Sequence, residues 1–299
     1  MSKPKAIVIS AADDNYLSLA QDLFHSIQAQ TFAYEFDLGL LDVGLSEPSR
    51  AWFKANNIHT EPVKSDIQYP ARAAWEARVP SYRTLSARPF LRRYFPGYDV
   101  YIWMDADVWV QTPDALNTMI EGASTSSAIH LSVELDRCYK MFFEDATMWS
   151  VYNGWYQACY NDDLITATMT LKPMLNAGVS AMSKDSPVWE TWLKIYADAL
   201  QKLPELDNKT FMTDQLALNI AVFMKNMPHV IMPAAFNWLT FFAIPVWDKK
   251  TSQYVEPMAP YRPISQFHLT QKPKLQVEKI TCTDGTIIER PLTYRARNS

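Results

Sequence analysis

Glycine and cysteine are scarce in this chain, and their scarcity excludes several kinds of protein. Only seven of the 299 residues are glycine, and neither the Gly-x-Gly-x-x-Gly pattern nor the Gly-x-x-x-x-Gly-Lys phosphate loop occurs. The three cysteines, Cys138, Cys159 and Cys282, are widely spaced and form no Cys-x-x-Cys pair. They predict neither a disulfide framework nor a cysteine zinc site. We therefore expect a protein of a reducing compartment, without a dinucleotide fold or a P-loop.

Long apolar segments are missing as well. No apolar run reaches the ~18 residues that a membrane helix requires, and the nearest, from Ala234 to Trp247, contains polar residues and a proline. The N-terminus leads directly into the strand-like segment Ala6–Ser10, without the apolar region of a signal peptide. We predict a cytoplasmic protein. The basic tail Arg290–Arg297 is expected to be solvated, with weak peripheral docking at the inner membrane face as the alternative.

The chain also lacks the excess of basic residues that nucleic-acid binding requires. Its formal net charge is -4 at pH 7, which gives no general attraction for a polyanion. Nucleic acid is therefore not expected as a partner, although the local cluster of Arg88, Arg92 and Arg93 could still meet phosphate.

Alternating strand and helix patterns fill the first hundred residues. After the strand Ala6–Ser10, the apolar residues Leu17, Ala20, Phe24 and Ile27 recur at steps of three and four, which indicates an amphipathic helix. The same reasoning predicts, in order, strand 35–41, helix 48–56, strand 58–63, helix 80–95 and a strand from residue 98. Such alternation favours an α/β layered sheet.

The second half of the chain is less regular in its pattern. Periodicity weakens over residues 112–172, where many aromatic residues occur, and we expect irregular structure there. A strand at 174–182 is followed by a helix after Ser186-Pro187 and by another helix from Thr213 to Phe223. Asp284-Gly285 between two β-like runs predicts a hairpin. We predict one domain over residues 1–275 and a small C-terminal extension, a hairpin and tail, over residues 276–299.

The most informative feature is the run from Tyr101 to Val110, in which the Asp-x-Asp pair Asp105 and Asp107 interrupts an apolar strand. Because strand side chains alternate between faces, residues two apart point the same way, and we expect these carboxylates to converge. Like charges this close repel each other and resist burial. A divalent cation removes both penalties, and Mg²⁺ or Mn²⁺ held by carboxylates is commonly completed by substrate phosphates. The alternative is two solvated acids near a turn.

Polar residues also follow the first strand, in the segment Ala11–Tyr16. Open α/β sheets bind ligands at the carboxyl ends of their strands. There Asp13 could accept the imide N–H of a uracil, and the Tyr16 ring could stack on the base. The alternative interpretation is an ordinary helix N-cap, since Asp and Asn favour that position.

These motifs together resemble glycosyltransferase family 8, the retaining enzymes that include glycogenin and bacterial lipopolysaccharide galactosyltransferases. The resemblance extends from about Ala6 to Lys274 and rests on short segments in a specific order: Ala12–Tyr16, Ser86–Arg88, Met104–Val108, Leu175–Val179, Asp214–Asn219, Phe236–Trp238 and Gln266–Pro273. It implies a GT-A fold, with a single Rossmann-like mixed sheet flanked by helices. It also implies a metal-dependent reaction, with Mn²⁺ or Mg²⁺, and a UDP-sugar donor.

The resemblance further implies roles for individual residues. Asp105, Asp107 and His268 would ligate the metal, since a neutral imidazole can join two carboxylates around Mn²⁺. The nucleotide-sugar would be bound by the following residues: Asp13, Asn15, Tyr16, Arg88, Asp105, Asn176 and either Lys272 or Lys274. Family members commonly carry a glycine and a longer step between the histidine and the lysine. In this chain the step from His268 to Lys272 is shorter and has no glycine, so both Lys272 and Lys274 stay candidates for the diphosphate. For Arg88 and Asn176 the alternatives are a helix-surface arginine and a hydrogen-bonded strand end.

Asp214 and Gln215, at the expected start of a helix, are the candidates for catalysis. Retention requires either a carboxylate or amide nucleophile on the opposite face of the sugar, or front-side attack guided by the leaving phosphate. Breaking the C1–O bond places negative charge on the UDP oxygens, which a metal and a lysine would stabilise. For Asp214 the alternative is an acid favoured by the helix dipole.

We predict a hexosyltransferase that moves glucose, galactose or an N-acetyl derivative to a hydroxyl of a saccharide, glycolipid or glycoprotein. Two other functions would use a similar fold. A sugar-phosphate nucleotidyltransferase would want a glycine-rich basic loop after the first strand, which is absent. A non-catalytic sugar-nucleotide-binding protein on the same scaffold is the second rival.

Overall fold

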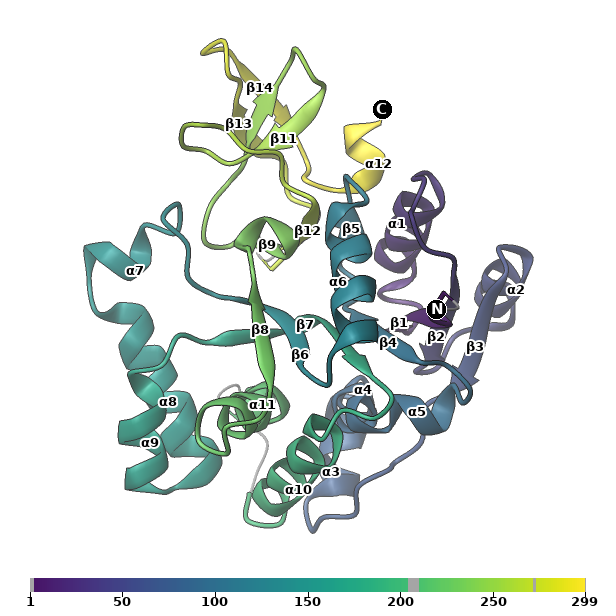
Figure 1. The fold of residues 1–299 in the computed structure, drawn as a ribbon, viewed down its shortest axis with the longest axis vertical. Helices are drawn as coiled ribbons and strands as arrows, with labels where there is room; N and C mark the ends of the chain where they lie inside the picture. The colour runs from purple at the N-terminus through teal and green to yellow at the C-terminus, as the bar shows by residue number, and fades with distance from the viewer. Residues whose placement is uncertain (1–2, 204–209, 271–272, 299) are drawn as a thin grey trace.

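A seven-stranded mixed sheet forms the centre of the molecule (Figure 1). The computed structural model describes residues 3–203, 210–270 and 273–298. In the order in which they lie in the sheet, its strands are β3 (Ile58–Pro62), β2 (Phe36–Asp42), β1 (Ala6–Ala12), β4 (Val100–Met104), β7 (Leu175–Ser183), β6 (Ile129–Val133) and β8 (His229–Met232). Strand β7 runs antiparallel to both neighbours, β4 and β6, whereas β1 is parallel to β2 and β4. The predicted α/β fold with a mixed sheet is confirmed.

Helices cover both faces of this sheet. Successive strand residues point to opposite faces, and apolar residues occur on both. Ala6 and Val8 of β1 pack with α1 (Leu17–Gln28) and α6 (Asp114–Thr125), whereas Ile7 and Ile9 contribute to a separate core on the opposite face. That second core contains α10 (Val188–Leu200) and α11 (Thr213–Phe223). The predicted helix 80–95 also lies there, divided into α4 (Tyr82–Ala87), η1 (Arg88–Phe90) and α5 (Leu91–Tyr94).

The aspartate pair lies in a turn between two strands, and the expectation that both residues interrupt one strand was wrong. Strand β4 ends at Met104, and β5 (Val108–Val110) begins a different sheet of order β5-β12-β9. The turn is closed by the N–H of Val108, which donates to the carbonyl of Asp105 at 3.0 Å. In the small sheet β12 (Gln266–His268) runs antiparallel to β5 and parallel to β9 (Trp238–Leu239), which places His268 opposite Val108. The second sheet thus brings His268 beside the turn.

Residues 112–172 are mostly regular, so the expectation of irregular structure was also wrong. Besides α6 and β6 this region forms α7 (Met141–Glu144), α8 (Thr147–Tyr160) and α9 (Asp163–Thr170). The buried residues of α8 are Met148, Tyr152, Tyr156 and Cys159, at steps of four, four and three. A helical stripe is therefore present, but large aromatic side chains compose it in place of the usual aliphatic ones. Figure 1 shows α7, α8 and α9 on the side of the sheet away from α1 and α2 (Glu47–Ala55).

The C-terminal residues form the expected hairpin, and the tail that follows is folded back on the protein as a partly exposed helix. Strands β13 (Glu278–Thr281) and β14 (Ile287–Arg290) pair antiparallel around Gly285, whose φ of +83° favours glycine. The tail ends in α12 (Tyr294–Arg297), where Arg295 pairs with Asp22 of α1 at 2.9 Å. Since Ile280 and Leu292 belong to the same core cluster as Trp109 of β5, the division at residues 275 and 276 stays a prediction.

The remaining elements of the structure are short. They are α3 (Arg72–Arg78), η2 (Thr210–Met212), η3 (Ala234–Phe236), β10 (Val246–Asp248) and β11 (Gln253–Val255). Within the described parts of the chain, every helix is too short or too polar to cross a membrane. All three cysteines are buried thiols, in agreement with the expectation that no disulfide forms.

Candidate functional site

Two carboxylates and an imidazole converge where the large and small sheets meet. The Nε2 atom of His268 lies 3.4 Å from Asp107 Oδ1 and 3.7 Å from Asp105 Oδ2. One ligand atom of each residue lies within 4.8 Å of the others. Asp107 and His268 are buried, and Asp105 is partly exposed. Oxygen and imidazole donors of this kind suit Mn²⁺ or Mg²⁺, so the three residues could hold a divalent cation.

The orientation of the His268 ring is fixed by a hydrogen bond on the side away from the two aspartates. Its Nδ1 lies 3.1 Å from the amide oxygen of Asn237, whose own amide nitrogen donates to Asn176 Oδ1 at 2.9 Å. Because Asn237 presents its oxygen to the ring, Nδ1 donates the hydrogen bond, and a ring that is neutral at Nε2 would turn that lone pair toward the two aspartates, as a metal ligand must. Hydrogen bonding at the second ring nitrogen is how metal-binding histidines are held in one tautomer. Sequence reasoning assigned no role to Asn237.

Gly178 of β7 permits the close approach of these groups. A Cβ atom at this position would lie 2.3 Å from His268 Cε1 and 2.8 Å from Asp105 Oδ2. Neither distance is compatible with a side chain, so the site in its observed geometry requires glycine.

Arg88 connects the aspartate turn to the predicted catalytic helix. Its guanidinium donates to Asp105 Oδ1 at 2.5 Å and to Asp214 Oδ2 at 2.7 Å, and it lies 4.9 Å from the ring centroid of Trp103. Burial opposes the charge, but the two carboxylates raise the pKa of Arg88 above its ordinary value. The alternative of a helix-surface arginine is wrong, because Arg88 is only 6% exposed.

A buried carboxyl group that the sequence analysis missed lies at the centre of the site. Glu134, directly after β6, accepts hydrogen bonds from Asn176 at 2.8 Å, Gln215 at 3.0 Å and Tyr152 at 2.7 Å. Burial raises the pKa of Glu134, although these three donors oppose the shift. The sequence did contain a sign of this residue, because Glu134 ends the strand-like segment 129–133. This sign was not used, because irregular structure was expected there.

Asp214 and Gln215 are held at the start of α11, facing the same cavity. Burial raises the pKa of Asp214, and the Arg88 guanidinium opposes that shift. The amide oxygen of Gln215 accepts the N–H of Ala177 at 3.0 Å, which attaches α11 to β7. Both side chains are buried. The structure therefore brings the two candidate catalytic residues, Asn176 and the three potential metal ligands into one site.

Of the two candidate lysines, Lys274 lies in the site. Its ammonium group contacts Asp107 Oδ2 and donates to the carbonyl of Leu269 at 2.7 Å. Burial opposes ionisation of Asp107, but His268 and Lys274 hold its pKa well below the usual range. Lys272 falls outside the described residues.

The residues predicted to bind uracil lie next to the site, at the carboxyl end of β1. Asp13 Oδ1 accepts the N–H of Tyr16 at 3.1 Å, and Asn15 donates to Asp13 Oδ2 at 3.2 Å. Asp13 thus closes the turn that leads into α1. Burial raises the pKa of Tyr16, and the charges of Lys274, Asp107 and Asp105 all act on its phenol, so Tyr16 is close to the candidate metal ligands. Its ring is 38% exposed.

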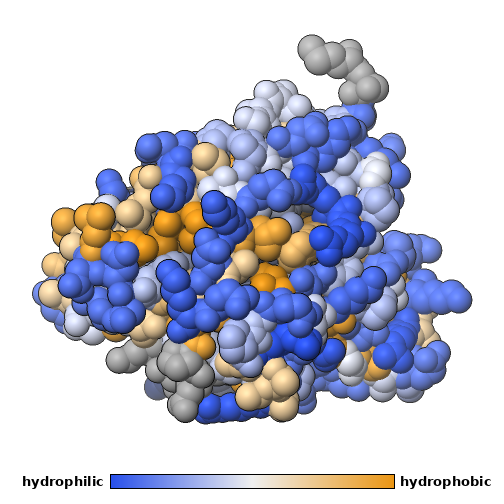
Figure 2. All heavy atoms as spheres, turned by 90° about the horizontal axis from the view of Figure 1, so that it is seen from below, coloured by the Kyte–Doolittle hydropathy of each residue, from blue (hydrophilic) through white to orange (hydrophobic). Residues whose placement is uncertain are grey.

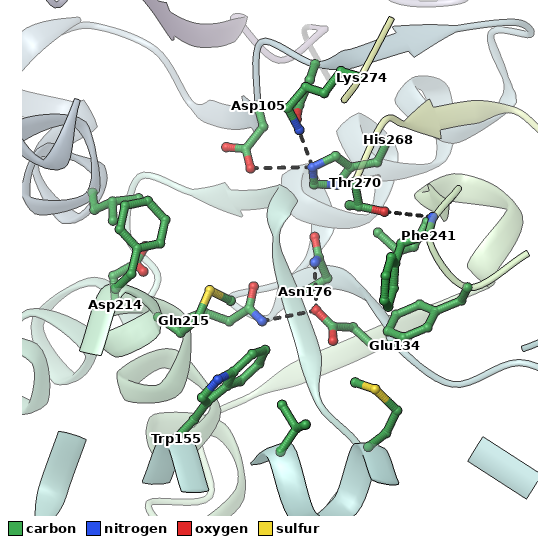
Figure 3. A pocket seen from close by; sticks show the side chains of 18 of the residues that line it. Asp105, Glu134, Trp155, Asn176, Asp214, Gln215, Phe241, His268, Thr270 and Lys274 are labelled. Atoms are coloured by element: carbon green, nitrogen blue, oxygen red, sulfur yellow. Dashed lines mark hydrogen bonds and ion pairs between the residues drawn. The ribbon is translucent and has the colours of Figure 1, made fainter. Parts of the chain in front are cut away.

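A cavity of about 520 Å³ contains this site (Figure 3). Its polar side is lined by Arg88, Asp105, Asp107, Glu134, Asn176, Asp214, Gln215, His268, Thr270 and Lys274. The other side is apolar and is lined by Leu85, Met148, Val151, Trp155, Phe211, Met212, Leu239, Phe241 and Phe242. Asp13, Asn15 and Tyr16 do not belong to the lining.

No protein-family model and no curated protein matches this sequence. Solved structures do match. The galactosyltransferase LgtC, in complex with donor and acceptor sugar analogues, is 17% identical, with a TM-score of 0.51 over 89% of this chain and 87% of LgtC. An active-site mutant of LgtC matches at 18% identity, with a TM-score of 0.50 over 88% of this chain and 86% of the mutant. Mouse xyloside xylosyltransferase 1, in its apo form, is 13% identical, with a TM-score of 0.50 over 88% and 97%.

These matches define the class of fold. The chain has the GT-A fold of the glycosyltransferases, a mixed sheet flanked by helices. The resemblance to glycosyltransferase family 8 that the motifs indicate is confirmed at the level of this fold.

Proposed function

We propose that this protein is a retaining glycosyltransferase that moves a hexose from a UDP-sugar to a hydroxyl of a saccharide or glycoconjugate. The observation that carries the proposal is the convergence of Asp105, Asp107 and His268 in a cavity that also contains Asp214 and Gln215. Buried acids that repel one another are costly unless a cation compensates them, so their position in one cavity supports a metal-dependent ligand. The GT-A fold supports the proposal independently of the residues.

The residues present fit a divalent cation. Gly178 leaves room for three donor atoms that would otherwise be separated by a side chain. A Mn²⁺ or Mg²⁺ ion bound there would supply positive charge to the diphosphate leaving group of the donor. Lys274, which contacts Asp107, is within reach of the same group, and we assign to it the role of neutralising the diphosphate.

The donor would extend from Asp13 and Tyr16 at the end of β1 to the polar side of the cavity. Tyr16 offers an exposed ring for the uracil, and Asp13 and Asn15 offer polar groups beside it. Asn176 donates one amide N–H to Glu134, and its second N–H is the group we assign to the donor sugar. Arg88 would act through Asp105 and Asp214, because both ends of its guanidinium are engaged by these carboxylates.

We propose that Asp214 and Gln215 act at C1 of the donor sugar, the carbon whose bond to the diphosphate breaks. Asp214 is held in place by Arg88 and Gln215 by Glu134 and Ala177, so both are oriented before substrate binds. Asp214→Asn and Gln215→Ala are expected to reduce transfer at least ~100-fold, as expected for groups acting on the transition state. The affinity for UDP, measured by calorimetry with Mn²⁺, should stay within about twofold. A parallel collapse of UDP affinity would contradict the assignment.

The function is tested by incubating the protein with individual UDP-hexoses and Mn²⁺ and measuring the release of UDP. A transferase is expected to release UDP slowly even without an acceptor, because water substitutes for the acceptor hydroxyl. Anomeric analysis of the released sugar by NMR would show whether the configuration is retained. Tight UDP binding without release from any donor would favour a non-catalytic sugar-nucleotide-binding protein instead.

The partners and location follow from the proposed reaction. The acceptor would be a saccharide, glycolipid or glycoprotein, and we propose the cytoplasm as the location. The basic tail is a weak candidate for membrane contact. Arg290 lies 4.1 Å from the Trp247 ring centroid, and Arg295 pairs with Asp22.

A further inference from the structure

The cavity has an apolar half that the transfer of a hexose between polar groups does not explain. Helix α8 contributes Met148, Val151 and Trp155, which recur at steps of three and four and so share one face of the helix. Phe241 and Phe242 contribute from the segment after β9. In Figure 3, Trp155 lies across the cavity from Asp105 and His268, and Phe241 lies at its side. One cavity therefore joins a charged end to an apolar end.

Two large apolar side chains of the cavity lining remain in contact with water. Phe241 is 53% exposed, and Phe211 of η2 is 38% exposed. Phe241 is nevertheless held in place: its N–H donates to Thr270 Oγ1 at 3.0 Å, and its ring lies 5.3 Å from that of Phe242. A fixed, exposed aromatic ring beside a cavity is a surface that a ligand can cover, with a gain of about 25 cal/mol for each Å² removed from water.

Apolar side chains are also exposed outside the cavity lining. Figure 2 shows apolar side chains gathered on the left of the face that lies below in Figure 1, on the side of α8 and α9, and extending toward its middle. Leu164 and Leu171, in and directly after α9, are 71% and 80% exposed. Apolar side chains are thus exposed to water near α9 as well as in the cavity lining.

The chemistry of the lining selects among occupants. A second sugar needs partners for its hydroxyl groups, and the aliphatic and thioether side chains Val151 and Met148 offer none. The hydrogen-bonding groups lie at the charged end and at Glu134, Asn176 and Gln215, which lie between His268 and Trp155 in Figure 3. A ligand that fills the whole cavity therefore needs a sugar hydroxyl at one end and an apolar group at the other.

We propose that the acceptor is an amphipathic glycoside, a saccharide that carries an alkyl or aryl group which packs against α8 and against Phe241 and Phe242. The inference rests on the proposed function, because it places the accepting hydroxyl beside Asp214 and Gln215. It adds the chemical class of the acceptor, and it assigns to α8 the role of a specificity element.

Binding of matched glycosides tests this assignment. For glucose, galactose and N-acetylglucosamine, the methyl, butyl and phenyl glycosides would be titrated into the protein with Mn²⁺ and UDP present, and binding followed by tryptophan fluorescence and calorimetry. The butyl and phenyl glycosides are expected to bind at least about tenfold more tightly than the methyl glycoside of the same sugar, because their additional carbon atoms are at least partly removed from water. These short groups avoid micelles.

Two variants locate the apolar group. Phe241→Ala is expected to reduce the preference for the butyl and phenyl glycosides to about threefold or less while leaving methyl glycoside binding unchanged, and Trp155→Leu should act in the same direction. Phe143→Ala is the matched control, since Phe143 of α7 is 66% exposed but does not line the cavity. It should leave the preference intact.

Equal binding of methyl, butyl and phenyl glycosides would overturn the proposal, as would the absence of binding by all of them. A preference that survives both Phe241→Ala and Trp155→Leu would also overturn it, because the apolar group would then bind elsewhere. Release of UDP from the donor alone tests the function separately. If UDP is released and no preference is found, only the acceptor class is wrong. If no donor is turned over, the acceptor role fails together with the function.

Discussion

Carboxyl groups outnumber the fixed positive charges among the described lining residues of the cavity. Four carboxyl groups face it, whereas Arg88 and Lys274 carry its fixed positive charges. Arg88 pairs with Asp105 and Asp214, and Lys274 pairs with Asp107. Burying such a group of charges is costly unless further positive charge is supplied, which is the physical reason to expect a divalent cation beside His268.

Loss of His268 should therefore remove metal binding. In His268→Ala the affinity for Mn²⁺ is expected to fall about 100-fold or more, since even the outer partners of metal ligands contribute 10–100-fold. Mn²⁺ binding would be measured by electron paramagnetic resonance. His229→Ala, at an exposed position in β8, is the control and should leave the affinity unchanged. Equal affinities in the two variants would show that the ion binds elsewhere.

Gly178 and Gly154 make a matched pair of substitutions. Gly178→Ala would place a Cβ 2.3 Å from His268 Cε1, so Mn²⁺ affinity should fall at least ~10-fold. Gly154→Ala lies in α8, where no heavy atom is within 4 Å of the added Cβ, and it should stabilise the protein by about 0.5–1 kcal/mol. The measurements are metal titration and denaturant unfolding. Unchanged metal binding in Gly178→Ala would contradict the geometry of the site.

At the scale of elements, the end of β2 contains a carboxylate that should make stability depend on pH. Asp42 accepts the N–H groups of Leu45 at 2.7 Å and Gly44 at 2.8 Å, and Arg50 Nε donates to it at 2.6 Å. Burial opposes ionisation, but these donors hold the pKa of Asp42 below its ordinary value. A depressed carboxyl pKa contributes stability that is present above the unfolded-state pKa of about 3.9 and is lost as pH falls through the folded-state pKa.

Asp42→Asn should consequently destabilise the protein by about 1–2 kcal/mol at pH 7, the difference between charged and neutral hydrogen bonds. The gap to the unaltered protein should narrow below about pH 4, as Asp42 itself becomes protonated. Urea unfolding at several pH values would measure it. Asp198→Asn, at an exposed position of α10, is the control. A gap that is constant from pH 7 to pH 3 would contradict the role assigned to the charge.

Some helices and strands could be predicted from the sequence and others could not. Most strands and helices up to Val100 follow ordinary periodicity, because aliphatic residues alternate or recur along single faces, whereas the short helix α3 was not predicted. Helix α8 escaped prediction because its stripe consists of aromatic residues such as Tyr152 and Tyr156, which are as common in strands. The convergence of Asp105 and Asp107 was predicted for the wrong reason, since a turn between two sheets produces it and not a continuous strand.

For the molecule as a whole, the site is assembled from distant parts of the chain. Motif order indicated which residues belong together, but the positions of Glu134 and Asn237 depend on packing between β6, β7 and the small sheet. Local pattern carries no information on such contacts. The site also needs β12 for His268, and the core that supports β12 includes Leu292 near the C-terminus. Fold, cavity and candidate metal ligands thus form one structural unit.

The most direct test of this account is the Mn²⁺ dependence of UDP release from UDP-hexoses, measured with the unaltered protein and with Asp107→Asn. We predict that the unaltered protein releases UDP from at least one donor with Mn²⁺, that chelation by EDTA stops the release, and that added Mn²⁺ restores it. Asp107→Asn should release UDP at least ~100-fold more slowly, because one charged ligand is lost. Release that proceeds equally with EDTA, or equally in Asp107→Asn, would contradict a metal-dependent glycosyltransferase.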